Sequence, residues 1–131
     1  MFDYTVTTNQ SVDEAVESLS SALKEVKFGV LWDFDVKETL NNKGFDDFNQ
    51  SIRILEVCNP KAAYEVLGME EKVSYFLPCK VVVYLSQDGT TKIGMPRPTS
   101  LMENIDNPDV KAFAEDIEKT MIQAIDQATN S

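Results

Sequence analysis

The sequence contains no histidine among its 131 residues, and this absence removes several kinds of site at once. A Ser-His-Asp or Cys-His catalytic arrangement, a histidine proton shuttle and a histidine-containing zinc site are all excluded. The chain also lacks a glycine-rich dinucleotide fingerprint, a phosphate-binding lysine loop and internal repeats. Many familiar catalytic and nucleotide-binding chemistries are therefore excluded.

Long apolar runs and basic charge are scarce as well. No apolar run approaches the ~20 residues that span a bilayer, and the N-terminus has neither the basic nor the apolar region of a signal peptide. The sequence therefore predicts a cytoplasmic protein without membrane contacts. With 22 acidic and 12 basic side chains the net charge is −10, which repels phosphate backbones, so no nucleic-acid partner is expected.

The remaining composition is that of one folded domain. Hydrophobic residues make up 43% and aromatic residues 9%, as in ordinary globular proteins. A chain of this length buries a core without disulfides or metals, and no linker divides residues 1–131. The two cysteines are expected as thiols, because a reducing compartment disfavours disulfides.

Two long amphipathic helices are predicted. The first follows a capping box formed by Ser11 and Glu14, has apolar residues at three- and four-residue steps from Val12 to Val26, and ends at Gly29. The second begins at Asn107-Pro108, where asparagine caps the helix and proline suits its first turn. A shorter helix over 61–67, with Gly68 as its terminator, is predicted between them.

Alternating and β-branched runs predict strands over residues 2–6, 29–40, 52–57, 73–85 and 91–95. Asp88-Gly89 marks a hairpin turn between the last two. The pattern predicts an α+β fold with a five-stranded, mainly antiparallel sheet and the two long helices on one face. In the second strand, Val30, Trp32, Phe34 and Val36 are expected to share one face.

The segment Val81–Leu85 is apolar on both faces, although an antiparallel strand with one wet face should alternate. If the helices cover one face of the sheet, the apolar residues on the other face need a different cover. Trp32, Phe34, Tyr75 and Tyr84 could supply an apolar surface there. Local loops could cover this face, or it could be a subunit interface; the interface is preferred.

Both cysteines lie beside prolines. Cys58-Asn59-Pro60 ends a strand and starts a helix, whose partial positive charge favours a thiolate and can lower the pKa of the thiol below ~8.5. Lys61 would add to this effect. The alternative is that Cys58 only fills space, since free cysteine is among the most buried residue types.

Cys79 follows Pro78, which removes a ladder donor and indicates a bulge or an edge position. If the two strands pair antiparallel, Cys58 and Cys79 could face each other. Such a pair could be a redox dithiol, a persulfide carrier, or half of a metal site completed by carboxylates or a second subunit. Lys37, if close to a thiolate, would stabilise it and could hold an anionic ligand; otherwise it is surface charge.

The runs ILEVCNPKAAYEVLG and LPCKVVVYL, with DVKETL at 35–40, resemble the family called domain of unknown function 302. The resemblance covers essentially the whole chain. The sequence departs from the pattern of this family in the loop after the last strand, where the family is expected to have Asp-Pro and this sequence has Met95-Pro96-Arg97-Pro98. The resemblance implies a fold like one half of the TATA-binding protein, β-α-β-β-β-β-α with an antiparallel sheet, and homodimers. It implies no assigned activity.

Three functions remain open. The preferred one is a small cytoplasmic protein that binds a small ligand or metal at a site containing Cys58, Asn59, Cys79 and Lys37. The second is a thiol-based redox or sulfur-transfer enzyme with Cys58 as the nucleophile. The third is a structural interaction module whose cysteines are packing residues. No cofactor and no catalytic residue is assigned.

Overall fold

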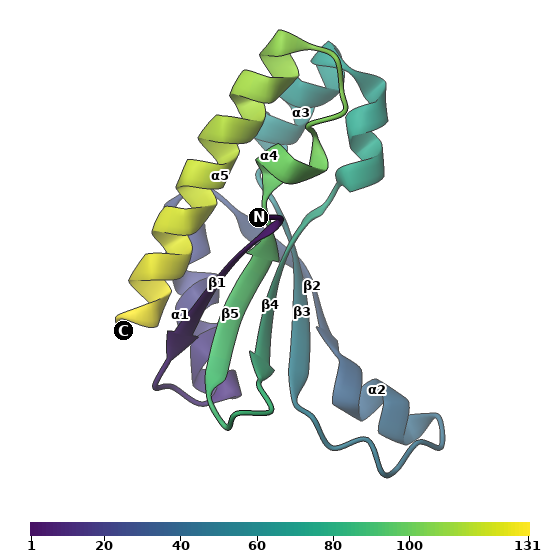
Figure 1. The fold of residues 1–131 in the computed structure, drawn as a ribbon, viewed down its shortest axis with the longest axis vertical. Helices are drawn as coiled ribbons and strands as arrows, with labels where there is room; N and C mark the ends of the chain where they lie inside the picture. The colour runs from purple at the N-terminus through teal and green to yellow at the C-terminus, as the bar shows by residue number, and fades with distance from the viewer.

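A computed structural model describes all residues, 1–131, and shows a five-stranded antiparallel sheet with its long helices on one face (Figure 1). The strand order is β1-β5-β4-β3-β2, and every neighbouring pair is antiparallel. The strands are β1 (Asp3–Thr8), β2 (Gly29–Asp35), β3 (Ile52–Cys58), β4 (Cys79–Leu85) and β5 (Thr91–Pro96). The predicted α+β fold is confirmed.

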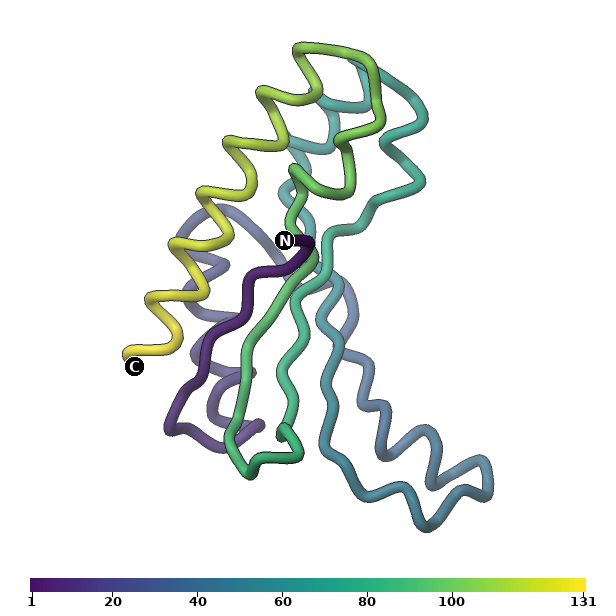
Figure 2. Tube along the Cα trace, viewed as in Figure 1, coloured from purple at the N-terminus to yellow at the C-terminus, as the bar shows by residue number.

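The two long helices, α1 (Val12–Glu25) and α5 (Pro108–Thr129), pack together against the sheet. The capping box predicted for α1 is present, and Asn107 caps α5 by accepting hydrogen bonds from two backbone N–H groups. Figure 2 traces α5 from one end of the molecule down along the sheet. Between these helices and the strands lies a 16-residue hydrophobic core, whose fully buried members include Leu19, Leu55 and Ile125.

A small lobe extends beyond the end of the sheet where the cysteines lie (Figure 1). It contains α3 (Pro60–Met69), the 3-10 helix η1 (Glu71–Phe76), the one-turn helix α4 (Pro98–Leu101) and the first part of α5. Its own core comprises Val66, Val73, Met102, Val110 and Ala114. The two cysteine-proline motifs therefore lie at the junction of the sheet and this lobe.

The predicted strand over 29–40 is wrong in its second half. β2 ends at Asp35, whose side chain accepts a hydrogen bond from the backbone N–H of Glu38 at 3.0 Å. This cap starts α2 (Val36–Asn42), so Val36 and Lys37 are helical. An aspartate cap satisfies free N–H groups at a helix start, which outweighed a short alternating pattern.

The expected common face of Val30, Trp32 and Phe34 is also wrong. A register shift between Val30 and Trp32 inserts one residue, so Val30 pairs with the buried Val57 whereas Trp32 pairs with Glu56. A bulge of this kind changes the face of every residue that follows it. Val30 therefore lies on the helix-covered face, and Trp32 lies on the open one.

The predicted strand over 73–85 begins later than expected, at Cys79, because Glu71–Phe76 forms the 3-10 helix. Glu70 caps that helix, and Val73 is fully buried in the lobe core. Gly68 lies inside α3 and does not end it. The residue with left-handed backbone after α1 is Lys27, with φ 71°, and not Gly29. Gly29 is instead the first residue of β2.

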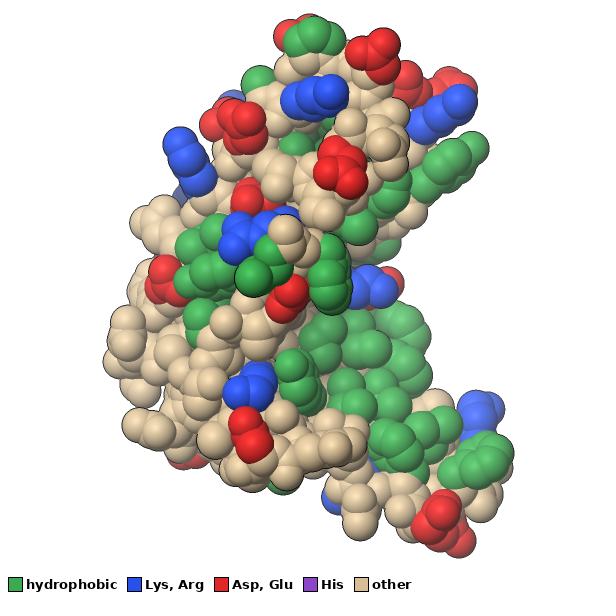
Figure 3. Space-filling model, viewed as in Figure 1, with side chains coloured by type: hydrophobic (Ala, Val, Ile, Leu, Met, Phe, Trp, Pro, Cys, Tyr) green, Lys and Arg blue, Asp and Glu red, His purple; other side chains and the backbone are tan.

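One face of the sheet carries no helix. Trp32 and Phe34 stack on it, with ring centroids 4.8 Å apart, and beside them lie half-buried Ile54, Val82 and Tyr84. Figure 3 shows hydrophobic side chains lining a hollow on this side of the molecule, between the lobe and α2. Tyr75, which was expected to contribute, belongs to η1 instead. None of the helices has the length and apolar character needed to cross a bilayer.

Candidate functional site

The cysteines occupy the ends of two neighbouring strands but do not face each other. Cys79 lies opposite Val57 in the β3–β4 ladder, and Cys58 lies opposite Gly29 in the β2–β3 ladder. Successive side chains of a strand point to opposite faces, so Cys79 shares the helix-covered face with Val57, and Cys58 takes the other direction. Both thiols are free. The facing pair hypothesised from the sequence is therefore not formed.

Both cysteines nevertheless line one cavity of about 320 Å³ at the junction of the sheet and the lobe. Thirteen of its 16 lining residues are hydrophobic, and Asn59 and Ser74 supply the polar side chains. The apolar walls come from α3, from α5 and from the start of β2, and include Phe28, Leu31, Ala62, Ala63, Phe113 and Ile117. We refer to this space as the cysteine cavity.

Asn59 is positioned by its role as a helix cap. Its side-chain oxygen accepts a hydrogen bond from the backbone N–H of Ala62 at 3.1 Å, and Pro60 occupies the first turn of α3. The oxygen of Asn59 accepts this bond with one of its two lone pairs, and its amide nitrogen is the group that could donate to a bound molecule.

The two thiols differ in their surroundings. Burial, and to a smaller extent the neighbouring charge of Cys58, raises the pKa of Cys79 to about 11. A thiol with this pKa is protonated at neutral pH, and the protonated form is neither a nucleophile nor a metal ligand. Cys58 is half-buried and directly precedes the capped start of α3. Its predicted activation by the helix stays a prediction.

Lys37 is not brought to the cysteine cavity. It lies on α2, which follows the end of β2 remote from the cysteines (Figure 1). There it lines a polar hollow together with Asp13, Asp35 and Arg53. Arg53 forms ion pairs with Asp13 and Asp33 in this region. The structure therefore separates the fourth predicted ligand-binding residue from the other three.

The arrangement of possible metal ligands is sparse. No group of three or more cysteine, aspartate or glutamate side chains lies close enough together to hold a metal ion. A closed zinc site has four ligands, whereas the cysteine cavity supplies two thiols. Metal binding would thus need ligands from outside the chain.

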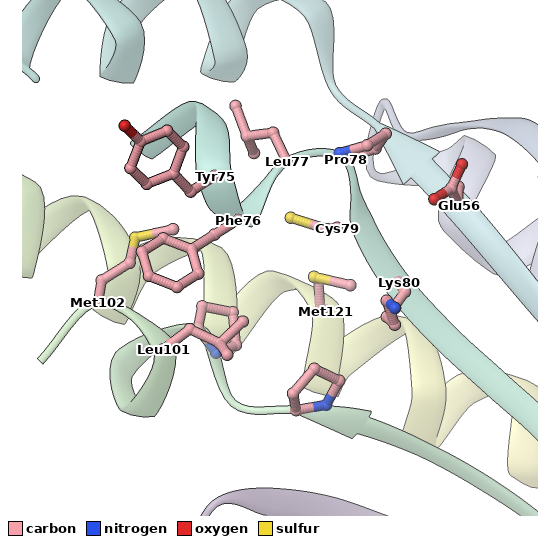
Figure 4. Close-up of a pocket in the computed structure, with 12 residues that line it drawn as sticks. Glu56, Tyr75, Phe76, Leu77, Pro78, Cys79, Lys80, Leu101, Met102 and Met121 are labelled. Carbon is pink, nitrogen blue, oxygen red and sulfur yellow. The ribbon is translucent and has the colours of Figure 1, made fainter. Parts of the chain in front are cut away.

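Several residues of the cavity were not singled out from the sequence. Phe113 and Ile117 recur at a helical period in the predicted last helix, and this periodicity was the signal that they face the rest of the protein; both are half-buried. The periodicity does not predict which part of the sheet this face of the helix will contact. A second cavity, drawn in Figure 4, lies beside Leu77-Pro78-Cys79 and was not expected at all.

Comparisons with known proteins agree with this fold. Residues 4–128 match the sequence model of the family described as domain of unknown function DUF302. A crystal structure of an uncharacterized conserved DUF302 protein from Bacillus stearothermophilus is similar over 98% of each chain, with 48% sequence identity and a TM-score of 0.92. Among curated proteins, no match is found.

Proposed function

The chain belongs to the DUF302 family, and we propose that it is a single-domain cytoplasmic protein that binds a small apolar molecule in the cysteine cavity. The observation that carries the proposal is the cavity itself. It measures about 320 Å³, and its walls are apolar apart from Asn59 and Ser74. Small-molecule sites are typically concave, of about 300–1,000 Å³, and mostly apolar with a few polar groups that orient the ligand.

The chemistry of the walls indicates the class of ligand. A compact aliphatic or aromatic group would bury its surface against Ala63, Phe113 and Ile117, at roughly 25 cal/mol for each Å² removed from water. One hydrogen-bond acceptor on the ligand would suit the amide nitrogen of Asn59. An organic ligand fits this donor set better than a metal ion does, because the cavity offers two thiols and no carboxylate.

The proposal is tested by NMR titration of the protein with 1-hexanol, which has a short apolar chain and one hydroxyl group. We expect saturable shifts at the backbone amides of Ala62 and Ala63. Ala63→Phe would fill the cavity and remove these shifts. Glu65→Phe adds the same ring to the exposed side of the same helix and is the matched control. Shifts that are absent in wild type, or that persist in Ala63→Phe, would refute the proposal.

A second candidate is a thiol enzyme with Cys58 as the nucleophile. It is supported by the position of Cys58, which lines the cavity and directly precedes the start of α3. The rate of alkylation of Cys58 against pH separates the candidates: a group that reacts well below pH ~8.5 favours the enzyme, and two inert thiols favour a module in which both cysteines are packing.

The partners of this protein are proposed as follows. The open sheet face, where Trp32 and Phe34 stack beside Ile54 and Val82, supports a homodimer formed through the sheet (Figure 3). Burial of such a surface is a main driving force of association. The net charge of −10 argues against a nucleic-acid partner.

A further inference from the structure

The cavity of Figure 4 has a volume of about 330 Å³ and opens where the sheet splits. β4 pairs with β5 only from Val82 to Leu85, whereas Cys79 and Lys80 at the start of β4 pair with β3 alone. At this end β5 pairs with β1 instead, up to Pro96. The strands β4 and β5 thus separate beside the lobe and leave a recess between them.

The two sides of this recess differ in character. Figure 4 shows Phe76, Leu101, Met102 and Met121 gathered on one side, with Glu56 and Lys80 on the strands at the other side. Met102 and Met121 are almost completely buried and form an apolar floor. A molecule that fits this recess has an apolar body and a charged end.

The charged side carries one acid and one base that are not paired with each other. Glu56 and Lys80 lie directly opposite in the β3–β4 ladder, on the open face of the sheet. Opposite charges in such positions ordinarily attract across the strands. The four ion pairs of the protein nevertheless involve other side chains: Arg53 with Asp13 and with Asp33, Lys92 with Asp88, and Arg97 with Glu118. Both charges are therefore available to a ligand.

We propose that this recess binds a free α-amino acid with a large apolar side chain. Its ammonium group pairs with Glu56, its carboxylate pairs with Lys80, and its side chain lies among Phe76, Leu101 and Met121. A ligand with a carboxylate but no ammonium group would leave Glu56 unpaired next to the negative charge of the ligand. A ligand with an ammonium group but no carboxylate would leave Lys80 unpaired next to a positive charge. A ligand with both charges on one small group pairs with both side chains at once.

This site is separate from the cysteine cavity and does not depend on the function proposed for it. The two spaces share the walls formed by Leu77, Pro78, Cys79 and Met102, but Glu56 and Lys80 line only the recess, and Asn59 lines only the cysteine cavity. Ala63→Phe, which fills the cysteine cavity, is expected to leave amino-acid binding unchanged. The two proposals can therefore fail independently.

The first test is calorimetric titration of the wild-type protein with three ligands that share a benzyl group. L-Phenylalanine carries both charges, N-acetyl-L-phenylalanine lacks the ammonium group, and 2-phenylethylamine lacks the carboxylate. We expect L-phenylalanine to bind, and each analogue to bind about tenfold more weakly, since a charged hydrogen bond is lost. No binding of L-phenylalanine at millimolar concentration, or equal binding of either analogue, would overturn the proposal.

The second test uses variants at the strand surface. Glu56→Gln is expected to weaken L-phenylalanine about tenfold and to reduce its preference over N-acetyl-L-phenylalanine; Lys80→Gln should reduce its preference over 2-phenylethylamine. Glu71→Gln and Lys72→Gln, at exposed positions of η1 that do not line the recess, are the matched controls. Equal losses in the controls, or unchanged ligand preferences in both strand variants, would refute the assignment of these two charges.

Discussion

Cys79 lies directly opposite Val57 in the ladder between β3 and β4, and Val57 is completely buried beneath the helices. The thiol of Cys79 therefore points into the core side of the sheet rather than toward Cys58. Burial is the main reason that its pKa rises to about 11. Both thiols are half-buried, and one residue of register thus separates Cys79, which is protonated at neutral pH, from Cys58 at a helix start.

Cys79 is expected to make the protein less stable in alkali. Its pKa is raised from an ordinary value of 9.0 to about 11, so between these pH values the unfolded chain loses the proton while the folded chain keeps it. The contribution of Cys79 to the free energy of unfolding is therefore fully present below pH 9. It is lost as the pH rises through 11, which lowers the free energy of unfolding by about 2 to 3 kcal/mol. Urea unfolding from pH 8 to 11 measures the slope.

Cys79→Ala should lower stability at every pH but flatten this alkaline decline. Cys58→Ala is the matched control and should keep most of it, because burial contributes more than the charge of Cys58 does. An alkaline decline of equal slope in wild type and Cys79→Ala would contradict the assignment.

Asn59→Ala should destabilise the protein by ~1 kcal/mol, because it removes the acceptor for the N–H of Ala62 at the start of α3. It should also change the alkylation rate of Cys58, which is adjacent to that helix end. Ser11→Ala removes the cap of α1, which accepts a hydrogen bond from the backbone N–H of Glu14 at 3.1 Å, and serves as control. The control variant should lose a similar free energy of unfolding and should leave the alkylation rate of Cys58 unchanged. The same change of alkylation rate in both variants would argue against a specific effect of the start of α3.

Glu118→Gln should destabilise the protein by about 2 kcal/mol at neutral pH. The carboxylate accepts hydrogen bonds from the backbone and the hydroxyl of Thr99, at 3.1 and 2.7 Å, and pairs with Arg97 at 3.2 Å. Burial alone would raise the pKa of Glu118, but these partners outweigh it and hold the pKa below its ordinary value of 4.5. The carboxylate therefore stabilises the fold above pH 4.5, and this is lost as the pH falls through its folded pKa.

The difference in unfolding free energy between wild type and Glu118→Gln should accordingly shrink in acid. Denaturant unfolding at pH 7 and at pH 3 measures it. Glu115→Gln, at an exposed position on the same helix, should change stability little at either pH. A pH-independent difference for Glu118→Gln would mean that shape rather than charge sets its effect.

Ile54→Asp should dissociate the proposed dimer, because Ile54 lies between Phe34 and Val82 on the open sheet face. A charge there would have to be buried without a partner. Analytical ultracentrifugation at micromolar concentration should show a wild-type dimer and a folded monomeric variant. Tyr64→Asp, on the exposed surface of α3, should remain dimeric. A monomeric wild-type protein would exclude the dimer.

Local signals in the sequence predicted the starts of α1, α3 and α5. Ser11 with Glu14, Asn59 with Pro60 and Asn107 with Pro108 each form the caps that their residue types indicate. A cap depends on atoms within one turn of the chain, so the neighbouring residues decide it. The apolar periods likewise predicted the buried faces of the long helices, and hence the layer on one side of the sheet.

The tertiary structure alone decided which of these elements meet. Val73 reads as a strand residue, yet the lobe core, with Met102 and Val110, holds it in a 3-10 helix. Lys37 reads as part of the strand over 29–40, yet the cap at Asp35 places it on α2, which follows the end of β2 remote from the cysteines. Periodicity predicts that a residue is buried, but it does not predict which element the residue packs against.

The same limit applies to the candidate sites. The sequence by itself determined that Cys58 ends a strand before a capped helix, because both features are local. Only the tertiary structure placed Phe113 and Ile117 over that strand end, and left Glu56 and Lys80 at the mouth of a recess where β4 and β5 separate. Cavities form between segments distant in the chain, so their walls follow from the packing of whole elements rather than from any one stretch of residues.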